Sequence, residues 1–131
     1  MYSVKSPGGS LYPYYYKGGE IHCLKYGSFY RNKDSLVALM KEEEDFILGK
    51  KRRMRIWVDF YKTNVTNEVI AEFVESICRI APSISKLSIV GCPAFTTWKI
   101  RSRLRKVRKS LPLKFFVDPE DAKTWLVSES M

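Results

Sequence analysis

The sequence has few of the residues from which metal sites and disulfide frameworks are built. Its three cysteines, Cys23, Cys78 and Cys92, are widely spaced and form no C-x-x-C pair, so neither a disulfide framework nor a zinc site is indicated. The single histidine, His22, stands in an apolar segment, which is more typical of a structural histidine than of a metal ligand or a catalytic base. We therefore expect no cofactor and a reducing, cytoplasmic environment.

Long apolar runs are absent as well. No segment approaches the roughly 20 apolar residues of a membrane span, and no basic segment followed by an apolar one opens the chain, so neither a span nor a secretory signal is expected. The 131 residues are enough to bury one core without disulfides or metals. Residues 1–10, which contain Pro and paired Gly, are expected to form a flexible tail, and residues 11–131 a single domain.

Familiar catalytic motifs are also missing: the chain contains no G-x-G-x-x-G, no G-x-x-x-x-G-K-[ST] and no G-x-S-x-G. Cys92 could be a nucleophile whose pKa is lowered at a helix start, or a small residue packed under the turn before Pro93. Asp59 could be an acid or base, or could accept hydrogen bonds from the loop that follows it. Since neither residue has a visible catalytic partner, we expect a protein that is not an enzyme.

What the sequence does contain is a regular alternation of strand and helix patterns. Two apolar runs joined by a Gly-Gly turn predict an N-terminal hairpin, and Pro13 confines the first run to a sheet edge. Strand patterns then alternate with helix patterns, which predicts a mostly parallel sheet. The predicted strands are 11–16, 20–26, 54–62, 86–91 and 113–117. The fold predicted is an α/β single-domain sandwich of order ββαβαβαβα, with helices packed on a central sheet.

Capping residues mark where the predicted helices begin. The expected caps are Asp34 or Ser35 for the first helix, Thr66 for the second and Asp118, followed by Pro119, for the last. Gly49 is the expected terminator of the first helix. That helix carries Leu36, Leu39, Met40, Glu43 and Ile47.

The third helix pattern, 94–109, is strongly basic, because seven Lys or Arg occupy the eleven positions from Lys99 to Lys109. Its apolar residues recur at i, i+4, i+7 and i+11, which indicates one buried stripe. That stripe consists of Ile100, Leu104, Val107 and Leu111. The opposite face, expected to be exposed, carries Arg101, Arg105, Lys106, Arg108 and Lys109. In a chain with 23 basic and 14 acidic residues, this face is either a solvated surface or a binding surface for a polyanion.

Ligands of open α/β sheets gather beyond the carboxyl ends of the strands, where loops lead into helices. The segments 59–68, 90–97 and 117–121 are expected to meet at that edge. The candidate ligand- or partner-binding residues in these loops are Asp59, Lys62, Asn64, Thr66, Asn67, Cys92, Thr96 and Thr97. Thr66 could simply cap its helix, or could be a phosphoacceptor, since a helix start favours negative charge.

Three segments resemble the STAS or SpoIIAA-like family, to which the anti-anti-sigma factors belong. They are RIWVDF (55–60), KLSIVG (86–91) and LKFFVDPEDAKTWL (113–126), and the resemblance extends over roughly residues 20–127. It implies a small regulatory domain without catalysis that responds to partner proteins, or binds a nucleotide or an apolar molecule. In anti-anti-sigma factors a Ser that follows an Asp after the central strand is phosphorylated; here Thr66 or Asn67 stands at that place.

Two functions are consistent with these patterns. The first is a non-catalytic, cytoplasmic regulatory module that binds an unidentified regulatory protein or small ligand through its strand-end loops. The alternative is a nucleic-acid or polyanion binder that uses the basic helix 99–109, joined by the basic residues 50–53 and the tyrosines of 12–16. The first function predicts binding without turnover, and the second predicts an affinity that falls steeply with salt.

Overall fold

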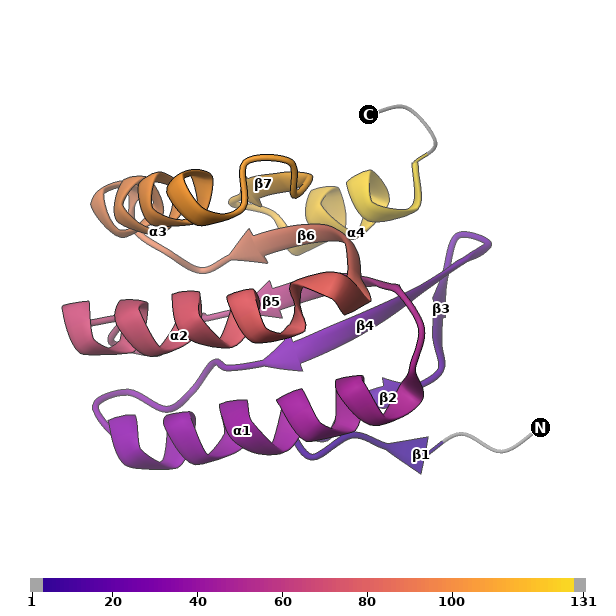
Figure 1. The fold of residues 1–131 in the computed structure, drawn as a ribbon, viewed down its shortest axis with the longest axis horizontal. Helices are drawn as coiled ribbons and strands as arrows, with labels where there is room; N and C mark the ends of the chain where they lie inside the picture. The colour runs from indigo at the N-terminus through magenta and orange to yellow at the C-terminus, as the bar shows by residue number, and fades with distance from the viewer. Residues whose placement is uncertain (1–3, 129–131) are drawn as a thin grey trace.

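The computed structural model describes residues 4–128 (Figure 1). The strands are β1 (Val4–Lys5), β2 (Leu11–Tyr12), β3 (Tyr14–Tyr16), β4 (Gly19–Lys25), β5 (Met54–Asp59), β6 (Ile84–Val90) and β7 (Leu113–Phe116). The helices are α1 (Lys33–Lys50), α2 (Asn67–Ile80), the short 3-10 helix η1 (Ala81–Ser83), α3 (Ala94–Val107) and α4 (Pro119–Val127). The predicted α/β class and the alternation of strands and helices are confirmed.

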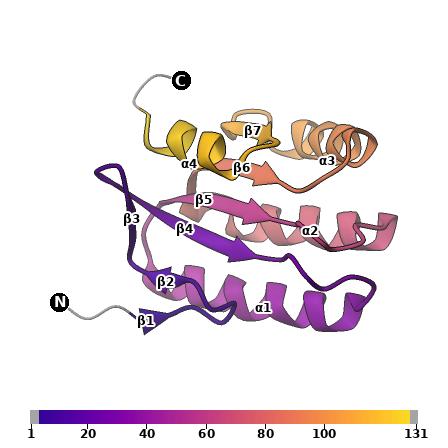
Figure 2. The same ribbon diagram turned by 180° about the vertical axis from the view of Figure 1, so that it is seen from behind.

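One five-stranded sheet, of order β3-β4-β5-β6-β7, forms the centre of the molecule. The β3–β4 hairpin is antiparallel, whereas β4, β5, β6 and β7 are parallel. The predicted edge strand 11–16 is only partly right, because it is interrupted at Pro13: β3 lies at the sheet edge, but β2 pairs with β1 in a separate two-stranded sheet. Helices α1, α2 and α3 lie side by side on one face of the sheet, and α4 lies on the other (Figures 1 and 2). Each of these three helices connects two neighbouring parallel strands, and because such connections are right-handed, all three helices lie on the same face of the sheet.

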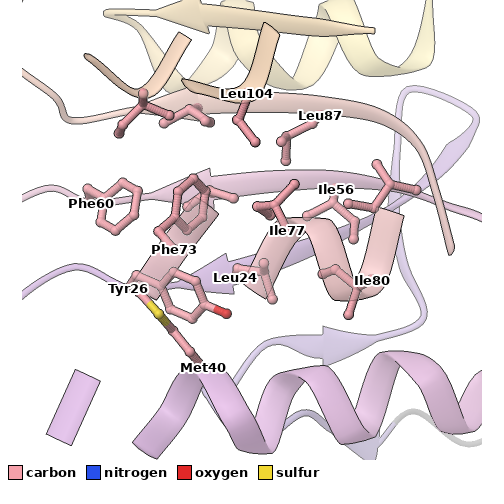
Figure 3. Close-up of a cluster of buried hydrophobic side chains, with 14 of the residues drawn as sticks. Leu24, Tyr26, Met40, Ile56, Phe60, Phe73, Ile77, Ile80, Leu87 and Leu104 are labelled. Atoms are coloured by element: carbon pink, nitrogen blue, oxygen red, sulfur yellow. The ribbon is translucent and has the colours of Figure 1, made fainter. Parts of the chain in front are cut away.

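Alternation along β5 decides which side chains enter the core. Ile56 and Val58 are fully buried under the three helices, while Arg55 and Trp57 point to the opposite face and are partly exposed. Figure 3 shows the resulting cluster, in which aliphatic side chains of the strands, and the rings of Tyr26 and Phe60 that directly follow β4 and β5, meet side chains of α2. Burial of each such side chain contributes about 1.5–3 kcal/mol. This cluster is the main stabilising feature of the fold.

The structure corrects the predicted ends of α1. Asn32, rather than Asp34 or Ser35, caps the helix, and its Oδ1 accepts a hydrogen bond of 3.2 Å from the N–H of Ser35. The helix ends at Lys50, and Lys51 with φ 55° forms the left-handed C-cap that was expected of Gly49. The caps predicted for α2 and α4 are confirmed, since Thr66 and Asp118 each accept a hydrogen bond from the first turn that follows.

The predicted stripe on α3 is only partly right. Ile100 and Leu104 are buried, but Val107, the last residue of the helix, is 53% exposed. Leu111 is buried from the following turn, because the helix ends before it and Arg108 closes the last turn by donating its N–H to the carbonyl of Leu104. The helix is therefore shorter than the charge pattern suggests.

Residues 4–10 belong to the fold, contrary to the expected flexible tail; residues 1–3 lie outside the described part of the chain. Strand β1 pairs with β2 in an antiparallel ribbon, and Ser6 and Ser10 are buried. Ser10 Oγ donates a hydrogen bond of 2.6 Å to the carbonyl of Cys23 in β4, and this bond anchors the ribbon to the sheet. The prediction failed because these anchors are polar and leave no apolar periodicity.

A buried polar cluster joins the same segment to α1. The carboxyl of Glu43 lies 3.1 Å from His22 Nε2 and accepts hydrogen bonds from Ser6 Oγ, at 2.8 Å, and from the N–H of Gly8, at 2.9 Å. Both His22 and Glu43 are at most 1% exposed. His22 thus has a structural role, as predicted, and the residues that the structure describes include no cluster of His, Cys, Asp and Glu fit to hold a metal ion.

Candidate functional site

The loops at the carboxyl ends of the parallel strands form one continuous surface, which we call the strand-end rim. It comprises the β4–α1 loop (26–32), the β5–α2 loop (60–66), the β6–α3 loop (91–93) and the first turns of α3. Main-chain hydrogen bonds cross from loop to loop: the N–H of Phe60 donates to Val90, that of Ser28 to Tyr61 and that of Tyr30 to Lys62. The loops therefore hold one another in place.

Two glycines allow these loops to approach so closely. A Cβ on Gly27 would lie 2.5 Å from the carbonyl oxygen of Tyr61, and a Cβ on Gly91 would lie 2.5 Å from the nitrogen of the same residue. Gly91 also has φ +89°, a conformation that other residues rarely adopt. The backbone of Tyr61 is consequently clamped between two glycines, and the rim is preorganised.

Large aromatic side chains project from this rigid framework into solvent. Tyr30 is 61% exposed, Tyr61 65%, Phe95 65% and Trp98 59%. The rings of Phe95 and Trp98 stack at 6.0 Å with an interplanar angle of 11°. Exposed aromatic side chains gathered on one edge are typical of interaction sites, because water there is displaced at a gain in free energy.

The sequence prediction missed these aromatic residues, although a signal for them exists. Tyr61 directly follows the apolar strand, at the edge where ligands were expected. Phe95 and Trp98 lie three positions apart on a helix whose buried residues are Ile100 and Leu104, so neither fits the inward stripe. An aromatic residue that departs from the buried face of its helix could have been identified as a surface candidate.

Cations accompany the aromatic rings of the rim. The ammonium of Lys62 lies 5.9 Å from the Tyr61 ring centre, and that of Lys99 lies 4.5 Å from the Phe95 ring centre. Lys99 also donates a hydrogen bond of 2.7 Å to Asn67 Oδ1, which joins α3 to the start of α2. The rim is thus both apolar and positively charged.

A pocket of about 320 Å³ opens in the rim between the starts of α1 and α2. Of the predicted residues, Asn64 and Thr66 line it, together with Arg31 and Lys33, which the sequence reasoning did not single out. Lys33 lies 3.4 Å from a carboxylate oxygen of Glu68 across the opening. The lining thus contains two cations and one carboxylate, and Lys33 is already paired with that carboxylate, so Arg31 is the group that favours an anion here.

The structure brings the predicted site residues of two loops together. Asp59 accepts a 2.8 Å hydrogen bond from the N–H of Tyr61, the structural role considered for it. The segments 59–68 and 90–97 meet as expected through Phe60 and Val90, so Lys62 and Asn67 lie on the same rim as the half-buried Thr96 and Thr97. The segment 117–121 follows β7, which is paired in parallel with β6, and therefore begins at the same edge.

Cys92 does not have the properties of a nucleophile. Burial raises the pKa of its thiol to about 12, and its side chain packs against the core. We predict that iodoacetamide at pH 7.5 modifies Cys92 in the native protein at least tenfold more slowly than in the protein unfolded in guanidinium, because only the thiolate reacts. Peptide mapping by mass spectrometry measures both rates, and equal rates would contradict the buried, protonated thiol.

Thr66 caps α2 from an exposed position. Its Oγ1 accepts a hydrogen bond of 3.2 Å from the N–H of Val69. We expect Thr66→Ala to lower the free energy of unfolding by about 0.5–2 kcal/mol, as measured by urea denaturation. A Thr66→Ala variant of unchanged stability that no longer bound a partner would instead favour the role of phosphoacceptor.

The basic face of α3 is exposed as predicted, but several of its cations have intramolecular partners. Arg105 donates to the main-chain carbonyls of Lys109, Leu111 and Leu113, at 3.4–3.5 Å. Arg108 donates to the carbonyl of Cys78, and the guanidinium of Arg101 lies 5.2 Å from the ring centre of Phe115. These arginines close the end of the helix and fix it to neighbouring elements.

Comparison of the chain with family models, with curated proteins and with solved structures finds no match. In the part of the chain that the structure describes, no helix is both long enough and apolar enough to span a membrane.

Proposed function

We propose that this protein is a non-catalytic, cytoplasmic regulatory module, similar to STAS or SpoIIAA-like domains, that binds a partner protein through its strand-end rim. The observation that carries the proposal is the group of exposed aromatic residues at this edge: Tyr30 and Tyr61 lie on loops held by main-chain hydrogen bonds, and Phe95 and Trp98 lie in the first turns of α3. A rigid aromatic surface loses little conformational entropy on binding, so most of the free energy of burial contributes to affinity.

The charges of the rim define the contact surface of the partner. Lys62, Lys99 and Arg31 surround the aromatic residues, which favours a partner that presents acidic side chains around an apolar centre. Nucleic acid is the second choice, because the arginines of α3 on which it depends already have main-chain or aromatic partners. Thr66 is the candidate phosphoacceptor, since a phosphate there would add negative charge to the pocket that Arg31 and Lys33 line.

The test uses peptides selected from a random display library on the immobilised protein. We expect the selected peptides to combine acidic and apolar residues. Their Kd, measured by fluorescence anisotropy, should rise at least tenfold in the variant Phe95→Ser/Trp98→Ser. Tyr15→Ser is the matched control, because Tyr15 is 59% exposed on β3, away from the rim, and its Kd should change less than twofold.

Two results would overturn the proposal. One is equal loss of affinity in the rim and control variants. The other is sub-micromolar binding of a U12 oligonucleotide at 0.15 M salt that is lost when Arg101, Arg105 and Arg108 are replaced by Glu. The second result would promote the nucleic-acid function, whose affinity should also fall steeply as salt increases.

A further inference from the structure

A second pocket lies on the other face of the sheet, away from the strand-end rim. Seen from behind (Figure 2), α4 lies towards β6, and no helix lies in front of the carboxyl halves of β4 and β5. The β1–β2 ribbon borders this uncovered region, and together they enclose a pocket of about 570 Å³. It is lined by Lys5, Gly9, Ser10, Leu11, Tyr14, Cys23, Lys25 and Trp57. Its volume is within the range of small-molecule sites.

The sheet and the ribbon give this pocket a largely apolar surface. Trp57 and Cys23 are neighbours across β4 and β5, and Leu11 and Tyr14 belong to the β2 and β3 strands beside them. Burial raises the pKa of the Cys23 thiol to about 12, so that group is neutral at physiological pH. A ligand of this pocket therefore needs an apolar or aromatic part.

Two ammonium groups supply the only charges among the lining residues. Lys25 Nζ makes one long hydrogen bond, of 3.4 Å, to the carbonyl of Gly9. Within residues 4–128, neither Lys5 nor Lys25 takes part in an ion pair. No acidic side chain lines the pocket, so its charge favours an anion. A carboxylate would gain two charged partners without displacing an existing ion pair.

The ribbon wall is held in place before any ligand binds. Ser6 and Gly8 donate hydrogen bonds to the buried carboxyl of Glu43, and Ser10 donates to the carbonyl of Cys23. A preformed wall lowers the ordering cost of binding.

We propose that this pocket binds a small amphipathic carboxylate, an acyl or aryl acid, with its apolar part against Trp57 and Leu11 and its carboxylate between Lys5 and Lys25. The site is independent of the proposed function, since it shares no residue with the strand-end rim. Two of its contacts can be removed by mutation without disturbing the core, because Lys25 is exposed and Leu11 is 51% exposed.

Isothermal titration calorimetry with sodium decanoate tests the site. We expect saturable binding with one site, and a Kd at least tenfold higher in Lys5→Gln/Lys25→Gln and in Leu11→Ser. The control Lys106→Gln/Lys109→Gln removes the same charge from α3 and should change the Kd less than twofold. Decanol, which lacks the carboxylate, should bind at least tenfold more weakly than decanoate. Circular dichroism verifies that each variant is folded.

Three results would overturn the proposal: no saturable binding of decanoate by the wild-type protein, equal weakening in the control variant, or equal affinity for decanol. Vesicles of phosphatidylglycerol separate a free acid from a membrane surface. If the protein sediments with these vesicles through Lys5 and Lys25 but does not bind decanoate, the lysines serve a membrane surface and the small-ligand site is wrong. Failure here leaves the rim proposal untouched, since the peptide assay uses different residues.

Discussion

Replacing Glu43 by Ala is expected to lower the free energy of unfolding by about 3–5 kcal/mol. The substitution leaves the imidazole of His22, the hydroxyl of Ser6 and the N–H of Gly8 without the acceptor that they share. These groups are buried or half-buried, so they cannot recover their hydrogen bonds fully in water, and the missing carboxyl also leaves a cavity. Urea denaturation monitored by circular dichroism measures the loss.

Glu42→Ala is the matched control, because Glu42 is the adjacent residue of α1 and is exposed. Its effect should stay within about 0.5 kcal/mol. We also expect faster amide exchange at residues 5–10 in Glu43→Ala, since the ribbon loses two of its anchors. A loss in Glu43→Ala no larger than in Glu42→Ala would show that the cluster does not stabilise the fold.

Gly91→Ala is expected to cost about 2–4 kcal/mol. Alanine would have to adopt φ +89°, a conformation that residues with a Cβ rarely adopt. Its Cβ would also lie 2.5 Å from the nitrogen of Tyr61 and 2.9 Å from the carbonyl carbon of Phe60. Both neighbours are main-chain atoms, so relief requires movement of the β5–α2 loop. The rim-binding peptides should therefore lose affinity as well, although none of the aromatic side chains has changed.

Gly49→Ala provides the contrasting control. Gly49 lies in α1, and a Cβ there meets no atom within 4 Å. This variant should be more stable than the wild type, by about 0.5–1 kcal/mol, since Ala favours the helix. If Gly91→Ala and Gly49→Ala changed the free energy of unfolding equally, the close packing of the rim loops against Gly91 would be contradicted.

The sequence pattern predicts the fold because its signals are local. In β5 the apolar residues alternate with partly exposed ones, and the caps Thr66 and Asp118 stand directly before their helices. The start of α1 is less well determined, because Asn32, Asp34 and Ser35 can all cap a helix. Asn32 is the residue that caps α1, and the loop before it is hydrogen-bonded to the β5–α2 loop. This contact joins segments far apart in sequence, so no local pattern contains it.

The role of the N-terminal segment also cannot be predicted from local sequence patterns, because it depends on tertiary contacts. Glu43 is buried on α1 together with Leu36 and Met40. The spacing of residues along the helix cannot identify its partners Ser6 and Gly8, which are far away in sequence and bind through one hydroxyl and one main-chain N–H. Polar partners of this kind follow from three-dimensional proximity, not from periodicity.

The candidate site was predictable in position but not in character. The edge where Thr66 and Lys62 lie follows from the parallel order of the strands. The aromatic nature of that edge depends on which way Tyr61 and Trp98 point, and this is fixed by the glycine contacts and by the buried stripe of α3. Side-chain direction at loops is a property of the assembled structure.

The position of α4 bears on how the newly made chain behaves in the cell. Helices α1, α2 and α3 each follow the strand they cover, so their face can assemble as it leaves the ribosome. The opposite face of the sheet cannot be completed until α4, the last helix in the chain, is synthesised. This helix contacts the β3–β4 hairpin: Tyr16 donates a hydrogen bond to Glu120, and Lys17 donates one to Thr124. Until that helix is synthesised, Trp57 and Phe116 lack the contacts that Lys123 and Trp125 of α4 make with their rings. A nascent chain stalled before α4 should therefore be a good substrate for chaperones that hold apolar surfaces.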